Sequence, residues 1–172
     1  MASFLEELEK QSIDRKIPII GSEKAKWLLS KVKEINAKKI LELGTANGYS
    51  GCVLGQEGAE LLTIEKDAKI AKEAEKNFSK LNINATVIVG DGVEEIKKLN
   101  SKFDLIFIDF AKKSYIEVLE DSIRLVRKGG LIIADNISFE GCRDFVKAIL
   151  QDKRLKTYLV PIKDGLSCSE RI

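Results

Sequence analysis

The sequence of 172 residues contains no histidine. Without an imidazole it cannot form a Ser-His-Asp triad, a Cys-His pair, an HExxH zinc site or a facial triad with two histidine ligands. Any general base must therefore be Asp, Glu, Lys, Tyr or Cys. The three cysteines, Cys52, Cys142 and Cys168, are far apart and lack CxxC spacing. We expect them to be small buried side chains in a reducing compartment.

The sequence also lacks an excess of one charge and long apolar runs. Lys and Arg number 29 against 27 Asp and Glu, for a net charge of +2, which does not indicate a dedicated nucleic-acid or membrane binder. No apolar stretch approaches the roughly 20 residues of a membrane span, and the acidic start MASFLEELEK does not resemble a signal peptide. We therefore expect a cytoplasmic protein that does not contact membranes.

Short apolar runs alternate with longer amphipathic ones, and no Gly/Ser-rich linker interrupts them. This pattern predicts an α/β, Rossmann-like doubly wound fold, with helices on both faces of a seven-stranded, mostly parallel sheet. We predict a single domain over residues 1–172, in which residues 1–20 form a short N-terminal helix and lead-in segment. The expected strands are 39–43, 61–64, 85–89, 105–108 and 131–134, followed by an antiparallel C-terminal β-hairpin of 158–162 and 166–172 around Asp164-Gly165.

Helical spacing of apolar residues predicts the connecting helices. Ser22 is the predicted N-cap of a helix that reaches Ile35, and Lys128-Gly129-Gly130 is the predicted stop of a helix that ends at Val126. The expected helices are 22–35, 67–81, 116–126 and 142–149, with a shorter one over 93–99.

A glycine-rich segment, Glu42-Leu-Gly-Thr-Ala-Asn-Gly-Tyr-Ser50, follows the first predicted strand. Ligands of an open parallel sheet bind at this edge, and Gly44 and Gly48 allow a ligand to approach the backbone, although packing alone could require them. The G-x-x-x-G spacing does not match the dinucleotide fingerprint G-x-G-x-x-G. Because Glu42 would repel a pyrophosphate and attract a cation, S-adenosylmethionine is favoured, and an NAD oxidoreductase is the weakest hypothesis.

Acidic side chains end the next two strands. Glu65 comes about 20 residues after the glycine-rich turn, where it could bond both ribose hydroxyls or be a solvated charge. Asp91, between Gly90 and Gly92, could accept from an adenine amino group, cap the following helix, or do both.

The fourth and fifth strands end in oxygen ligands. Asp109 follows the fourth strand, and Asp135-Asn136 follow the fifth. Their carboxylate and amide oxygens suit Mg²⁺, although the same residue types are common loop caps. Lys112, three residues after Asp109 and followed by Lys113, is by itself better explained as a solvated lysine at the start of a helix.

Taken together, these segments resemble the class I S-adenosylmethionine-dependent methyltransferases, and more narrowly the cation-dependent O-methyltransferases of the catechol and caffeoyl-CoA type. The resemblance covers roughly residues 18–172. Its most specific segments are Ile40–Ser50, Phe107-Ile-Asp-Phe-Ala-Lys112 with Tyr115, Leu125–Asn136 and Leu159–Leu166.

The resemblance implies a role for each matching residue. It places Glu42 and Ser50 at the amino-acid end of the methyl donor. It also brings the backbone of Gly44 and Thr45 close to the donor and makes Ile20 a further donor contact. It assigns Glu65 to the ribose, and Asp91 and Gly92 to the adenine side. Asp109, Asp135 and Asn136 match the metal ligands, Lys112 matches the catalytic lysine, and Asp109 also counts among the catalytic and donor-binding residues.

The chain also departs from the family. Phe110-Ala111 stand where plant members have Ala-Asp, so one polar donor contact is absent. The N-terminal extension is short, and a substrate-gating insertion after Asn136 is missing. The site is therefore expected to be open to a bulky substrate or covered by a partner subunit, and we expect a homodimer.

The acceptor remains open at this point. The leading hypothesis is a small, hydroxylated, catechol-like molecule, whose proton Lys112 would accept beside the cation. Some relatives methylate a hydroxylated uridine in tRNA, and a basic first helix with Lys24, Lys26, Lys31, Lys33, Lys38 and Lys39 would suit tRNA, although it could also be a solvated face. A non-catalytic S-adenosylmethionine-binding module is the alternative from another class.

Overall fold

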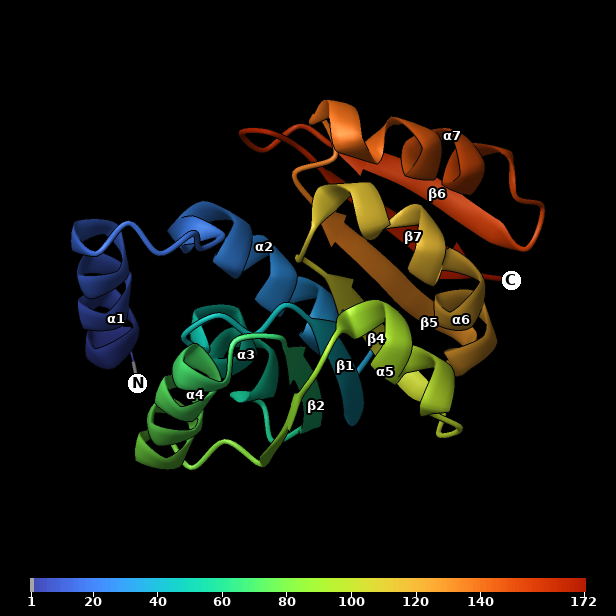
Figure 1. Ribbon diagram of the computed structural model, residues 1–172. Helices are drawn as coiled ribbons and strands as arrows, with labels where there is room; N and C mark the ends of the chain where they lie inside the picture. The colour runs from blue at the N-terminus through green and yellow to red at the C-terminus, as the bar shows by residue number, and fades with distance from the viewer. Residues whose placement is uncertain (1) are drawn as a thin grey trace.

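A seven-stranded sheet runs through the middle of the protein in the computed structural model, which describes residues 2–172 (Figure 1). The strand order is β3-β2-β1-β4-β5-β7-β6, and β7 is antiparallel to both of its neighbours. The predicted fold class is confirmed. The strands are β1 (Lys39–Leu43), β2 (Glu60–Glu65), β3 (Ala85–Val89), β4 (Phe103–Ile108), β5 (Val126–Asp135), β6 (Leu155–Val160) and β7 (Leu166–Arg171).

Helices cover both faces of this sheet because adjacent strand residues point to opposite sides. Ile40 packs in the core beneath α2, α3 and α4, while its neighbour Leu41 packs in the core beneath α5, α6 and α7. Leu8 joins α1 to the first of these cores. The helices are α1 (Ala2–Asp14), α2 (Gly21–Glu34), α3 (Tyr49–Gly55), α4 (Ala68–Lys80), α5 (Gly92–Lys98), α6 (Leu119–Leu125) and α7 (Arg143–Gln151), with 3-10 turns η1 (Lys112–Ser114), η2 (Ile116–Val118) and η3 (Glu140–Cys142).

The order of the strands reverses beside β1. The chain runs outward from β1 through β2 to β3, and then returns to add β4 and β5 on the other side of β1. At such a switch point the loops after neighbouring strands turn away from each other and leave a crevice. The loops after β1 and β4 therefore frame the site.

Two predicted helix limits are wrong. Ser22 does not cap α2; its backbone N–H instead donates to Glu9 Oε1 of α1 at 2.9 Å, so an acceptor from another helix replaces the local cap. The predicted helix 116–126 begins with the turn η2, and Val126 already belongs to β5, where it pairs with Phe103. Lys128-Gly129-Gly130 therefore lie within β5, where they form an irregularity between Val126 and Leu131, the two residues that pair with β4 on either side.

The C-terminal hairpin is confirmed, with one strand displaced. β6 spans residues 155–160 rather than 158–162, and Pro161 lies in the loop to β7. Proline has no N–H to donate to a strand ladder, so it ends the strand. The three cysteines are free and buried, as expected. Within residues 2–172, no helix has the length and apolar character needed to span a membrane.

Candidate active site

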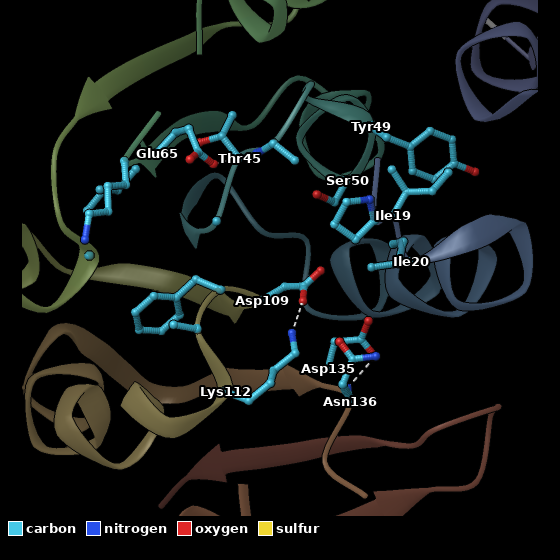
Figure 2. A pocket seen from close by; sticks show the side chains of 18 of the residues that line it. Ile19, Ile20, Thr45, Tyr49, Ser50, Glu65, Asp109, Lys112, Asp135 and Asn136 are labelled. Carbon is cyan, nitrogen blue, oxygen red and sulfur yellow. Dashed lines mark hydrogen bonds and ion pairs between the residues drawn. The ribbon is translucent and has the colours of Figure 1, made fainter. Parts of the chain in front are cut away.

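A cavity of about 790 Å³ opens at the carboxyl ends of the parallel strands (Figure 2). It joins the glycine-rich loop after β1 to the loops after β2, β3, β4 and β5. Of the predicted site residues, those that line it are Ile20, Gly44, Thr45, Ser50, Glu65, Asp91, Gly92, Asp109, Lys112, Asp135 and Asn136. Glu42 does not line it.

The glycine-rich loop brings backbone to the cavity wall. Gly44 has φ +102°, and a Cβ there would lie 2.0 Å from the carbonyl oxygen of Asp109, so only glycine fits between β1 and the end of β4. The N–H of Ala46 donates to Glu65 Oε2 at 2.9 Å, and the N–H of Asp67 donates to Glu65 Oε1 at 2.9 Å. Glu65 is thereby held at the cavity by two backbone donors.

Glu42 lies behind this loop and is fully buried. Its two oxygens accept hydrogen bonds from Ser50 Oγ at 2.5 Å and Thr63 Oγ1 at 2.6 Å, and Thr63 in turn contacts Thr45 at 2.5 Å. Burial raises the pKa of Glu42 to about 8, with smaller contributions from the charges of Asp109 and Glu65, while the two hydroxyl donors oppose the shift. The structure thus places Ser50 and Thr45, rather than Glu42, at the cavity surface.

Asp91 and Gly92 line the cavity at the start of α5. Asp91 caps this helix, because its Oδ1 accepts from the N–H of Val93 at 2.9 Å. Beside Gly92 lies the ring of Phe110, which a Cβ at Gly92 would contact at 3.3 Å. Phe110 lines the cavity and stacks on Tyr115, with ring centroids 5.7 Å apart. From the sequence, Phe110 marks only the loss of a polar donor contact, although its place directly after Asp109 is itself a signal for a position in the cavity.

The loop after β4 holds an ion pair. Lys112 Nζ donates to Asp109 Oδ1 at 2.6 Å and to the hydroxyl of Tyr115 at 3.0 Å. Tyr115 is fully buried and donates to the backbone carbonyl of Asp135 at 3.1 Å. Burial, followed by the charge of Asp109, raises the pKa of Tyr115, so this hydroxyl keeps its proton and fixes Lys112 against the end of β5.

Asp135 and Asn136 extend the site from the end of β5. Asn136 has φ +56°, a left-handed conformation that asparagine tolerates better than most residues. Burial raises the pKa of Asp135 to about 6, and the charge of Asp109 acts in the same direction, while Lys24 opposes it. Lys24 of α2 and Asp164 of the β6–β7 loop also line the cavity. Neither was predicted, because the sequence does not show that these distant segments meet.

The donor set matches a hard divalent cation. The carboxylates of Asp109 and Asp135 and the amide of Asn136 supply only oxygen ligands, as Mg²⁺ and Ca²⁺ prefer. In the part of the chain that the structure describes, no group of three His, Cys, Asp or Glu side chains could hold a metal. The amide of Asn136 would therefore have to complete the set, with water supplying further ligands.

Comparison with known proteins gives a consistent family. The model of the O-methyltransferase family matches residues 1–172. Catechol O-methyltransferase from Niastella koreensis is 34% identical over 131 residues, which cover 71% of this chain and 59% of that protein, so the chain spans less than two thirds of this relative. Caffeoyl-CoA O-methyltransferase from Citrus natsudaidai is 29% identical over 183 residues, which cover 88% of this chain and 79% of that protein.

A solved structure extends the likeness to nearly the whole chain. The O-methyltransferase from Bacillus cereus in complex with SAH superimposes with a TM-score of 0.91 at 26% identity, covering 99% of this chain and 91% of that one. The match of the family model to the full sequence, on this fold and this site, shows that the chain belongs to the O-methyltransferase family.

Proposed function

We propose that this protein is an S-adenosylmethionine-dependent, divalent-cation-dependent O-methyltransferase that acts on a catechol-like hydroxyl of a small molecule. One observation carries the proposal. A single cavity joins the glycine-rich loop and Glu65 at one end to the Asp109–Lys112 ion pair, Asp135 and Asn136 at the other (Figure 2). A methyl donor and a hydroxyl acceptor can therefore meet within it.

The residues divide the task between donor and acceptor. Thr45 and Ser50 would bind the amino-acid end of the donor, Glu65 its ribose, and Asp91 and Phe110 its adenine. The bound donor supplies an electrophilic methyl group on a sulfonium, whose positive charge suits the acidic residues of the cavity. Placing methyl and acceptor oxygen together is the main catalytic contribution expected of such a site.

Lys112 is the proton acceptor in this proposal. A divalent cation held by Asp109, Asp135 and Asn136 would lower the pKa of an acceptor hydroxyl. Lys112 Nζ, which Asp109 and Tyr115 hold in place, would first release its own proton to water and then, as a neutral amine, take the proton from that hydroxyl.

The cavity wall supports an aromatic acceptor more than an RNA. Phe139, three residues after Asn136, lines the cavity and is 48% exposed, which offers apolar surface to a flat ring. Several of the lysines expected to form a basic helix face have acidic partners. Lys24 is buried, while Lys31 and Lys33 each form an ion pair with a glutamate.

The test is methyl transfer from labelled S-adenosylmethionine into catechol or into total undermodified tRNA, each with Mg²⁺ or with EDTA. We expect label in catechol that EDTA abolishes. Lys112→Ala should lose the transfer, whereas Lys113→Ala, which changes the adjacent exposed lysine, should keep it. Label only in tRNA would move the activity to RNA modification. Transfer that persists in EDTA would refute the role of the cation, and donor binding without transfer to any acceptor would favour a binding module.

The oligomeric state is a separate part of the proposal. We expect a homodimer in which the second subunit covers the open mouth of the cavity, because the stretch after Asn136 lacks the family's substrate-gating insertion. Sedimentation equilibrium would test it, and a monomer that retains full activity would contradict it.

A further inference from the structure

Lys24 is a charged side chain with an uncommon location. It projects from α2, only 2% of its side chain is exposed, and its ammonium group reaches both the end of β5 and the β6–β7 loop. There it donates to Asp135 Oδ1 and to Asp164 Oδ1. Burial of a charge is costly unless it is paired and hydrogen-bonded, so these two carboxylates account for the position of Lys24.

Asp164 uses its second oxygen on another site residue. Its Oδ2 accepts a hydrogen bond from Asn136 Nδ2 at 2.6 Å. The backbone also joins the two segments, because the N–H of Ser138 donates to the carbonyl oxygen of Asp164 at 3.1 Å. Lys24 and Asp164 thus form one connected network with both Asp135 and Asn136.

This network determines which atoms face the cavity. Asp135 Oδ1 accepts from Lys24 and from the N–H of Asn136, while within residues 2–172 no hydrogen-bond donor reaches Asp135 Oδ2. Asn136 donates through Nδ2 and so presents its carbonyl Oδ1 on the other side. A carboxylate oxygen and an amide oxygen can bind a cation, whereas an amide NH₂ cannot.

We propose that Lys24 and Asp164 are positioning residues that orient Asp135 and Asn136 for a divalent cation without touching it. The inference rests on the proposed function, because it supposes that the cation binds at Asp109, Asp135 and Asn136. Residues that orient metal ligands typically contribute about 10–100-fold to metal affinity.

Charge alone gives a different expectation, which makes the inference testable. Lys24→Met removes a positive charge, so electrostatics alone would tighten cation binding. Asp164→Asn removes a negative charge and would weaken it. If Lys24 and Asp164 instead orient the metal ligands, both substitutions weaken cation binding. In Asp164→Asn the new amide keeps its oxygen toward Lys24 and turns its NH₂ toward Asn136, which must then rotate its own carbonyl away from the cavity.

The experiment measures the Kd of Mn²⁺ alone by the electron paramagnetic resonance of the free ion. It compares the wild type, Lys24→Met, Asp164→Asn and the double variant, whose net charge equals that of the wild type. We expect every variant to raise the Kd about tenfold or more, while binding of S-adenosylhomocysteine at the other end of the cavity is retained. A Lys24→Met protein that binds Mn²⁺ as tightly as the wild type or more tightly, or a double variant with wild-type affinity, would overturn the inference.

Two further outcomes are separable. A wild-type protein that binds no Mn²⁺ would refute the cation in the proposed function, and the positioning role with it. If the wild type binds Mn²⁺ and the variants bind it equally well, only the positioning role is refuted.

If circular dichroism shows that Lys24→Met does not fold, Asp164→Asn is compared with Asp164→Ala, which makes the same change of charge without an NH₂ to rotate Asn136. We expect weaker binding in Asp164→Asn, and equal affinities would contradict the proposal.

Discussion

The buried carboxyl of Glu42 predicts an unusual dependence of stability on pH. Its pKa rises from an ordinary 4.5 to about 8, mainly through burial. An acid whose pKa is raised in the folded state stabilises that state while protonated. Its contribution is complete below the unfolded pKa and is lost as the pH rises through the folded pKa. As the pH rises from about 4.5 to about 8, the protein should therefore lose the contribution of Glu42 to its stability.

The magnitude follows from the size of the shift. Each pH unit over which only the folded state binds the proton corresponds to about 1.4 kcal/mol. The full shift from 4.5 to about 8 then limits the effect to about 5 kcal/mol. The Glu42→Gln side chain cannot ionise, and the hydroxyls of Ser50 and Thr63 remain as its hydrogen-bond partners. As the pH rises, the unfolding free energy of the variant should therefore increase relative to that of the wild type.

The assay is urea unfolding at several pH values from 5 to 8.5, followed by circular dichroism and by the fluorescence of the single tryptophan, Trp27. Glu75→Gln, on the exposed side of α4, is the matched control, and its difference from the wild type should stay level. Parallel stability curves for Glu42→Gln and the wild type would show that Glu42 is ionised in the folded protein and would refute the argument from burial.

Three further substitutions test the site. Lys112→Ala should lower kcat by about 10²–10⁴, the usual contribution of a general base, in steady-state assays in which donor binding is retained; an unchanged kcat would remove Lys112 from the reaction. Gly44→Ala should abolish S-adenosylhomocysteine binding in calorimetry, because its Cβ would lie 2.0 Å from the Asp109 carbonyl oxygen; wild-type affinity would contradict the tight loop. Tyr115→Phe leaves the buried carbonyl of Asp135 without its hydroxyl donor and should cost about 1–3 kcal/mol in urea unfolding, whereas no loss would indicate that water replaces the hydroxyl.

Most of the sheet, and most of the residues that line the cavity around the glycine-rich loop, could be predicted from the sequence because their signals are local. Short, largely apolar runs such as residues 39–43 and 85–89 coincide with β1 and β3. The polar residues that end these and the neighbouring strands line one cavity, since parallel strands bring their carboxyl ends to the same edge. Asp67 and Asp91 cap α4 and α5 through their own side chains, which is also a local interaction.

Only the tertiary structure decided features that depend on distant partners. Pairing with Phe103 made Val126 part of a strand although glycines follow it, and Glu9 replaced the cap expected from Ser22. The sequence by itself determined which chemical groups stand at the strand ends. The environment of these groups depends on burial and tertiary contacts. Glu42 is enclosed in the protein, and Lys24, one lysine among many in the sequence, lies between Asp135 and Asp164. Local spacing cannot encode this, because the pairs that Lys24 forms join residues 111 and 140 positions apart in the chain.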